Sequence, residues 1–151
     1  MKLIKGNVFE YEGLDFICVT TNSILNSKGE LVMGAGIALE AKKMYPELPT
    51  VFGCKVDKLG VRGQDYYILQ HKNIIVFQTK RHYRDNSPID LVSKSVNRLK
   101  FLATVFEDSI FGLPFPAINN GGLNREDVLP MASLYLKGFV DLPISITGTW
   151  L

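Results

Sequence analysis

The sequence has few of the residue types that build metal centres and disulfide frameworks. Its 151 residues include only two cysteines and two histidines. Cys18 lies in an apolar run and is expected to be a buried small hydrophobe. Neither His71 nor His82 has a cysteine partner at zinc spacing. We therefore expect no disulfide framework, no metal site, no cofactor and a reducing, cytoplasmic compartment.

Long apolar segments and a strong excess of one charge are also missing. No apolar run approaches the roughly 18 residues that a membrane helix needs, and the N-terminal MKLIKGN lacks the apolar stretch of a signal peptide. The 17 basic and 15 acidic residues give a net charge of +2, which excludes a role dominated by polyanion binding but allows a local basic site. We expect a protein without membrane contacts, and a monomer.

Signatures of several enzyme classes are absent as well. There is no G-x-S-x-G nucleophile elbow and no G-K-[ST] phosphate loop. The dinucleotide fingerprint G-x-G-x-x-G begins at Gly34 but fails, because its third glycine position holds Leu39. Serine-hydrolase, kinase and zinc-hydrolase functions are therefore excluded.

The hydrophobic pattern alternates between strands and helices. Strands are predicted at 2–4, 14–20, 66–69, 74–77, 109–113 and 144–147, and helices at 36–45, from 88 to about 103, and around 127–137. The segments at 66–69 and 74–77 are predicted to form a hairpin. For the second helix we expect Ser87 as the N-cap and Pro88 at the first helical position. This order predicts one three-layer α/β domain over residues 1–151 with a mixed central sheet.

Ligands of such sheets bind at the carboxyl ends of the strands, and three loops there have suitable chemistry. The loop after the second strand ends in VMGAGIA (32–38), whose glycines and helix start suit an anion such as a diphosphate. Residues 120–123 (NGGL) follow the fifth strand and are typical of a backbone-lined cradle or of an ordinary surface turn.

The third loop, TKRHYR (79–84), is basic. Lys80 directly follows an apolar strand, and a lysine close to other cations can have a depressed pKa and act as a nucleophile. A phosphate contact or a solvated basic loop are the alternatives. Phe77, His82 and Tyr83 are aromatic residues near this loop that suit base stacking, or that pack the strand end.

Taken together, the loops resemble the macrodomain family, which has an ADP-ribose-binding α/β/α fold. GNV (6–8), DFICVTTN (15–22), MGAGIA (33–38), TKRHYR (79–84) and NGGL (120–123) occur in the family's order and span nearly the whole chain. The combination of MGAGIA with a Thr-Lys loop is similar to one branch. That branch contains terminal ADP-ribose protein glycohydrolases and antitoxin macrodomains that remove ADP-ribose from DNA, and it is close to ADP-ribose 1″-phosphate phosphatases.

The resemblance implies a role for particular residues. Lys80 matches the lysine that attacks the anomeric carbon of the distal ribose, and Asn22 matches the asparagine that faces this ribose. Asn7 stands at an adenine-side polar contact where the family often has Asp. The remaining matches line the two phosphate loops, and they are Gly34, Ala35, Gly36 and Ile37 in the first and Asn120, Gly121, Gly122 and Leu123 in the second.

One position departs from the glycohydrolase branch. The branch has an Asp directly after the Gly-Leu of the last loop, where this chain has Asn124. An amide holds a hydroxyl by hydrogen bonds but cannot take a proton near neutral pH. The expectation is then either weak or absent turnover, or a nearby carboxylate such as Asp127 in place of the missing one.

Three functions remain open at this point. The first is a hydrolase that removes ADP-ribose from a modified protein or nucleic acid, with Lys80 as nucleophile and Asn22 and Asn124 orienting the ribose. The second is an ADP-ribose 1″-phosphate phosphatase. The third is a module that binds ADP-ribose without turnover. Hydrolysis of an ADP-ribosyl bond is the preferred hypothesis.

Overall fold

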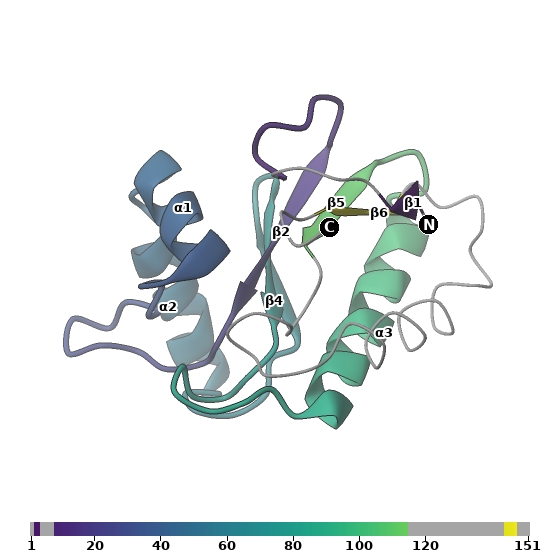
Figure 1. The fold of residues 1–151 in the computed structure, drawn as a ribbon. Helices are drawn as coiled ribbons and strands as arrows, with labels where there is room; N and C mark the ends of the chain where they lie inside the picture. Colours follow the sequence, from purple (N-terminus) through teal and green to yellow (C-terminus); the bar gives the residue numbers. More distant parts are fainter. Residues whose placement is uncertain (1, 4–7, 115–143, 148–151) are drawn as a thin grey trace.

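A six-stranded sheet forms the centre of the computed structural model, which describes residues 2–3, 8–114 and 144–147 (Figure 1). The strands lie in the order β1-β6-β5-β2-β4-β3. Their bounds are β1 Lys2–Leu3, β2 Phe16–Thr21, β3 Ile68–His71, β4 Ile74–Gln78, β5 Phe111–Pro114 and β6 Ile144–Thr147. The sheet is parallel except that β3 pairs antiparallel with β4. The predicted hairpin and the mixed, mostly parallel sheet are confirmed.

Helices cover both faces of this sheet. Helices α1 (Gly36–Met44) and α2 (Leu48–Leu59) lie on one face, and α3 (Ile89–Val105) lies on the other (Figure 1). The crossovers follow from the parallel strands, because parallel neighbours need a long connection that packs back onto the sheet. The described residues therefore form the predicted three-layer α/β/α architecture.

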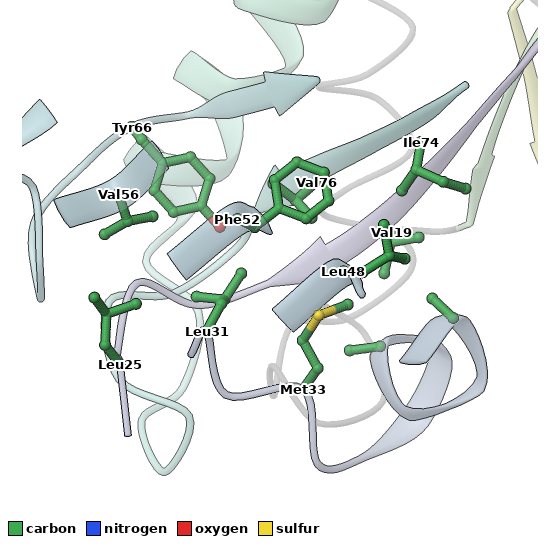
Figure 2. Packing of buried hydrophobic residues seen from close by; sticks show 12 residues of the cluster. Val19, Leu25, Leu31, Met33, Leu48, Phe52, Val56, Tyr66, Ile74 and Val76 are labelled. Atoms are coloured by element: carbon green, nitrogen blue, oxygen red, sulfur yellow. The ribbon is translucent and has the colours of Figure 1, made fainter. Parts of the chain in front are cut away.

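The core between the sheet and helices α1 and α2 includes side chains from the loop that leads into α1. Figure 2 shows this cluster, in which side chains of β2, β4 and α2 meet residues from the loop before α1. Phe52 of α2 and Val76 of β4 are completely buried, and Leu31 and Met33 of the loop are 1% and 2% exposed. Burying a side chain of this size contributes about 1.5–3 kcal/mol. The loop that leads to the glycine segment is thus anchored by its own apolar residues.

The helices differ from the prediction in two places. Residues 48–59 form α2, where no helix was predicted. Pro49 lies in the first turn, where proline is tolerated, and Gly60 ends the helix in the left-handed conformation with φ 68°. At α3 the N-cap is Pro88 and not Ser87, and the buried Ser87 hydroxyl makes no hydrogen bond within the described part of the chain.

Some expectations fall where the structure gives no description. The helix around 127–137 lies outside the described residues, and the extent of the single domain over 1–151 stays a prediction. Cys18 is fully buried, and burial raises the pKa of its thiol far above the ordinary range, as expected of an inert core cysteine. Within the described ranges, no helix is long and apolar enough to cross a membrane.

Candidate functional site

The site is built where β2 and β4 end side by side. The parallel pairing of these strands continues beyond them, since the Thr79 amide donates to the Thr21 carbonyl at 3.0 Å. One step further, the amide and the hydroxyl of Ser23 both donate to the Arg81 carbonyl, at 3.2 and 3.1 Å. The segments around Asn22 and Lys80 therefore share one rim, as the sequence predicted.

Asn22 holds the loop between β2 and α1 in shape. Its Nδ2 donates to the Val32 carbonyl at 3.0 Å, and its Oδ1 accepts from the Ile24 amide at 2.8 Å. The backbone closes the same loop, because the Val32 amide donates to the Ile24 carbonyl. With an exposed fraction of 7%, the Asn22 side chain thus braces the start of the glycine segment. Its predicted contact with a ribose stays a prediction.

The glycine segment presents backbone to solvent at the start of α1. Gly34, Ala35 and Gly36 are exposed, whereas Ile37 packs against the core and fixes the helix below them. Gly36 has φ 55°, which favours glycine, and a Cβ added at Gly34 would meet no atom within 4 Å. Among the described residues, no atom therefore blocks access to the backbone at Gly34.

The N-terminus of α1 has the chemistry of an anion site. The cap residue Ala35 has an extended backbone and makes no side-chain hydrogen bond, and the first turn contains no acidic residue. The first amides of the helix thus lack a capping side chain, and the helix dipole adds positive potential there. The basic residues Lys42 and Lys43 lie in the last turn, where their positive charges interact favourably with the negative end of the helix dipole.

Lys80 lies over its own loop at the end of β4. Its Nζ donates to the Tyr83 carbonyl at 3.2 Å. Partial burial lowers the pKa of Lys80 below its ordinary 10.5, and the Asp85 carboxylate opposes that shift. The direction is the one expected of an amine nucleophile. The cause differs from the sequence hypothesis, because burial and not the neighbouring cations produces the shift.

The Arg81 side chain is paired within the protein. Its guanidinium makes two hydrogen bonds to the Asp65 carboxylate, Nε to Oδ1 at 2.7 Å and Nη2 to Oδ2 at 2.9 Å. This pairing with Asp65 is the main cause that raises the pKa of Arg81. The sequence hypothesis of a uniformly basic 80–84 loop is therefore corrected, since one of its three cations is neutralised by the loop before β3.

The rest of that loop has a half-buried His82 beside an exposed Tyr83 and an exposed Arg84. The rings of His82 and Tyr83 lie 4.4 Å apart between centroids, and the guanidinium of Arg84 lies 5.7 Å from the Tyr83 ring centroid. Tyr83 is 41% exposed. Phe77, in contrast, is completely buried in β4, so it packs the sheet and is no stacking candidate.

Two buried polar side chains below the rim were not identified from the sequence. Gln78 is fully buried at the end of β4, and its Oε1 accepts from the amides of Tyr66 and Tyr67 at 2.8 and 3.0 Å. Its Nε2 donates to the carbonyls of Gln64 and Lys80. A polar residue that ends an otherwise apolar strand was the available signal.

Tyr66 is the second of these residues. Its hydroxyl donates to the Asn22 carbonyl at 2.7 Å and is hydrogen-bonded to the Thr21 hydroxyl. Burial raises the pKa of this phenol above its ordinary range, so the hydroxyl keeps its proton. Gln78 and Tyr66 together tie the loop before β3 to both halves of the rim.

Several predicted site residues lie outside the described residues. These are Asn7, Asn120, Gly121, Gly122, Leu123 and Asn124. Their roles stay predictions that rest on the resemblance. In the part of the chain that the structure describes, no group of three or more His, Cys, Asp or Glu side chains is placed to hold a metal ion.

The chain is similar in sequence to two mycobacterial proteins. No family model matches it. The proteins named DNA ADP-ribosyl glycohydrolase from Mycobacterium tuberculosis H37Rv and from Mycobacterium bovis BCG Pasteur are each 30% identical to it over 128 residues. The match covers 78% of this chain but 36% of each relative, so the chain spans about a third of the length of the relatives that it matches.

Solved structures share the fold over almost the whole chain. The macrodomain of Mycobacterium tuberculosis DarG has a TM-score of 0.79 at 24% identity, covering 97% of this chain and 95% of that one. The macrodomain of Thermus aquaticus DarG follows at 0.78 and 22%, with the same two coverages of 97% and 95%. Thermosipho africanus DarTG in complex with ADP-ribose scores 0.77 at 22%, covering 97% of this chain and 41% of that one. The chain therefore has the macrodomain fold.

Proposed function

We propose that this protein binds an ADP-ribosyl group at the ends of β2 and β4 and hydrolyses the bond at the anomeric carbon of its distal ribose. The observation that carries the proposal is the placement of Lys80, an amine with a lowered pKa, on the same rim as the uncapped N-terminus of α1. A nucleophile and an anion site on the same edge of the sheet suit a ligand whose diphosphate lies one ribose away from the bond that breaks.

The glycine segment supplies the binding part of this proposal. The exposed backbone of Gly34 and Gly36 and the first amides of α1 hold the diphosphate, since no side chain or acidic residue competes for them in the first turn. Asn22 keeps the loop in register from below. The carry-over of Asn120 to Leu123 as the opposite wall of the diphosphate site is part of the same proposal.

Lys80 supplies the reacting amine. The neutral amine forms a bond to the anomeric carbon, while the bond to the acceptor breaks and its electron pair leaves with the acceptor, which takes up a proton. Water then replaces the lysine at that carbon, so the net reaction is hydrolysis and free ADP-ribose is released. The lowered pKa favours this step because it increases the fraction of amine that is unprotonated.

We propose modified DNA as the acceptor. The support is the name of the two mycobacterial relatives, DNA ADP-ribosyl glycohydrolase, together with a rim loop that carries basic and aromatic side chains. The active form is proposed to be a monomer in the cytoplasm, in keeping with the free thiols of Cys18 and Cys54. Light scattering of the purified protein checks the monomer.

A paired assay tests the function. Calorimetry with ADP-ribose measures binding, and release of ADP-ribose from a modified single-stranded oligonucleotide measures turnover. Lys80→Ala should abolish release and leave ADP-ribose binding within a few-fold of the unsubstituted protein. Release that survives this substitution contradicts the role of Lys80. Tight binding without release in the unsubstituted protein would assign it as an ADP-ribose reader, and no binding at all would overturn the whole proposal.

A further inference from the structure

Beside the proposed site, three consecutive residues form a surface that the hydrolysis itself does not use. We call His82, Tyr83 and Arg84 the 82–84 platform. Its two rings are tilted by 30° to one another at 4.4 Å between centroids, and the Arg84 guanidinium lies over the Tyr83 ring at 5.7 Å. The Arg84 amide also donates to His82 Nδ1 at 3.1 Å, which fixes the orientation of the imidazole.

The platform is prearranged and yet open to solvent. A tyrosine that is 41% exposed forgoes much of the free energy that its burial in the core would provide. Its ring nevertheless packs against the His82 imidazole and lies under the Arg84 guanidinium. A fixed, exposed aromatic face next to a cation is the arrangement that stacks on a nucleobase.

The platform is also joined directly to the reacting group. The Lys80 amine donates to the backbone carbonyl of Tyr83, so the platform lies in the same loop as the nitrogen that would attack the ribose. An acceptor that leaves the distal ribose on this side of the rim would pass the Tyr83 ring, and a flat aromatic acceptor would stack on it.

We infer that the 82–84 platform stacks on an unpaired nucleobase of the acceptor strand, next to the modified nucleotide. This inference rests on the proposed function and deepens it, since it selects single-stranded nucleic acid over a protein side chain. Stacking carries the selectivity because the local charge is small. Asp65 neutralises Arg81, and the Asp85 carboxylate acts on Lys80. Arg84 is therefore the cation that the platform itself contributes.

Binding of fluorescent oligonucleotides to the full chain tests the inference. The probe is a single-stranded DNA of about eight nucleotides with one ADP-ribosylated base, and free ADP-ribose is measured in parallel by calorimetry. Tyr83→Ala should weaken binding of the modified oligonucleotide about tenfold and leave binding of free ADP-ribose unchanged, since base stacking on an aromatic residue is worth about 5- to 160-fold in affinity. Tyr83→Phe and Tyr83→Trp keep the ring and should restore the affinity.

Matched controls separate stacking from other effects. Phe101→Ala removes an aromatic side chain of 69% exposure from α3 and should change neither affinity. Annealing a complementary strand should abolish the difference between Tyr83 and its Ala variant, because paired bases are not available to stack. Arg84→Gln should lower the salt dependence of oligonucleotide binding by about one counterion or less.

The outcomes separate failure of the stacking inference from failure of the proposed function. Equal oligonucleotide affinity for Tyr83→Ala overturns the platform while hydrolysis stands. An equal loss for an ADP-ribosylated peptide or for free ADP-ribose also overturns it, because Tyr83 then contacts the ADP-ribosyl group and not a base. If the protein binds no ADP-ribose but Tyr83→Ala still weakens unmodified single-stranded DNA, the proposed function fails and the platform is supported. If the protein binds no ADP-ribose and Tyr83→Ala also leaves its affinity for single-stranded DNA unchanged, both the proposed function and the platform fail.

Discussion

The side chains of Arg81 and Asp65 form a two-point ion pair that joins the loop after β4 to the loop before β3. The bonds are 2.7 and 2.9 Å long, and the Arg81 carbonyl at the same time accepts from the amide and hydroxyl of Ser23. Arg81 therefore joins its own loop to two others. Its side chain binds the loop of Asp65, and its carbonyl binds the loop of Ser23. Arg81 thus shapes the rim, and Arg84 is the cation that lies over the exposed Tyr83 ring.

Breaking this pair should cost little stability but loosen the rim. Asp65→Asn is expected to lower the free energy of unfolding by about 0.5–1 kcal/mol, because the arginine and aspartate side chains are 40% and 23% exposed and solvent screens them. A double-mutant cycle with Arg81→Gln in urea denaturation measures the coupling. The coupling should shrink in 1 M salt. A coupling above about 2 kcal/mol, or one insensitive to salt, contradicts this account.

Gln78 should matter far more to stability than the exposed ion pair. Gln78→Met keeps the approximate volume but leaves the buried amides of Tyr66 and Tyr67 without their acceptor. An unsatisfied buried polar group costs about 1–3 kcal/mol, so we expect a loss of about 2–4 kcal/mol in the free energy of unfolding. Chemical denaturation measures this loss, and Gln70→Met on the neighbouring strand β3 is the matched control. An unchanged midpoint for Gln78→Met would show that the network is dispensable.

Gly53 of α2 should be sensitive to the smallest enlargement. A Cβ there would lie 2.9 Å from the Glu30 Cα and from the Leu31 amide nitrogen, and it would collide with the Gly29 carbonyl. Gly53→Ala gains up to about 1 kcal/mol of helix propensity, but overpacking costs about 1–3 kcal/mol. We expect net destabilisation and weaker ADP-ribose binding, since the displaced turn leads into the glycine segment. Thermal unfolding and calorimetry check both, with the exposed Cys54→Ala as control.

The sequence predicted the rim because the relevant signals are local. The strand at 144–147 has the predicted bounds, and the segments around Asn22, Gly34 and Lys80 follow strands whose parallel carboxyl ends share one edge. Helix α1 was predicted at 36–45 from the spacing of its apolar residues. Periodicity and position in the chain were sufficient for these elements.

The sequence did not predict features that depend on partners far along the chain. Tyr66 contacts Thr21 and Asn22 across 45 and 44 positions, and Arg81 reaches Asp65 across 16. Gly53 is a glycine because the turn at residues 29–31 packs against it, and no residue near it in the sequence indicates that contact. Such choices are made by tertiary contacts, so neither propensity nor periodicity reveals them.

The pH dependence of hydrolysis should report the titration of Lys80. Burial lowers the pKa of this amine, and the Asp85 carboxylate raises it, so removal of that charge by Asp85→Asn should lower the pKa further. The rise of kcat/KM with pH, which follows the neutral amine, is then expected to shift to lower pH in Asp85→Asn. Lys80→Arg, which stays protonated, should show no hydrolysis at any pH.

The same titration has a defined sign for stability. Because the folded pKa of Lys80 lies below the ordinary 10.5 of the unfolded chain, the unfolded state binds more protons between these two values. The contribution of Lys80 to the free energy of unfolding should therefore rise with pH through that window, and Lys80→Met should remove this part of the pH dependence. Urea denaturation at a series of alkaline pH values measures it. A rate profile of Asp85→Asn that shifts to higher pH would contradict both the assignment of Lys80 as the titrating amine and that of Asp85 as the group that raises its pKa.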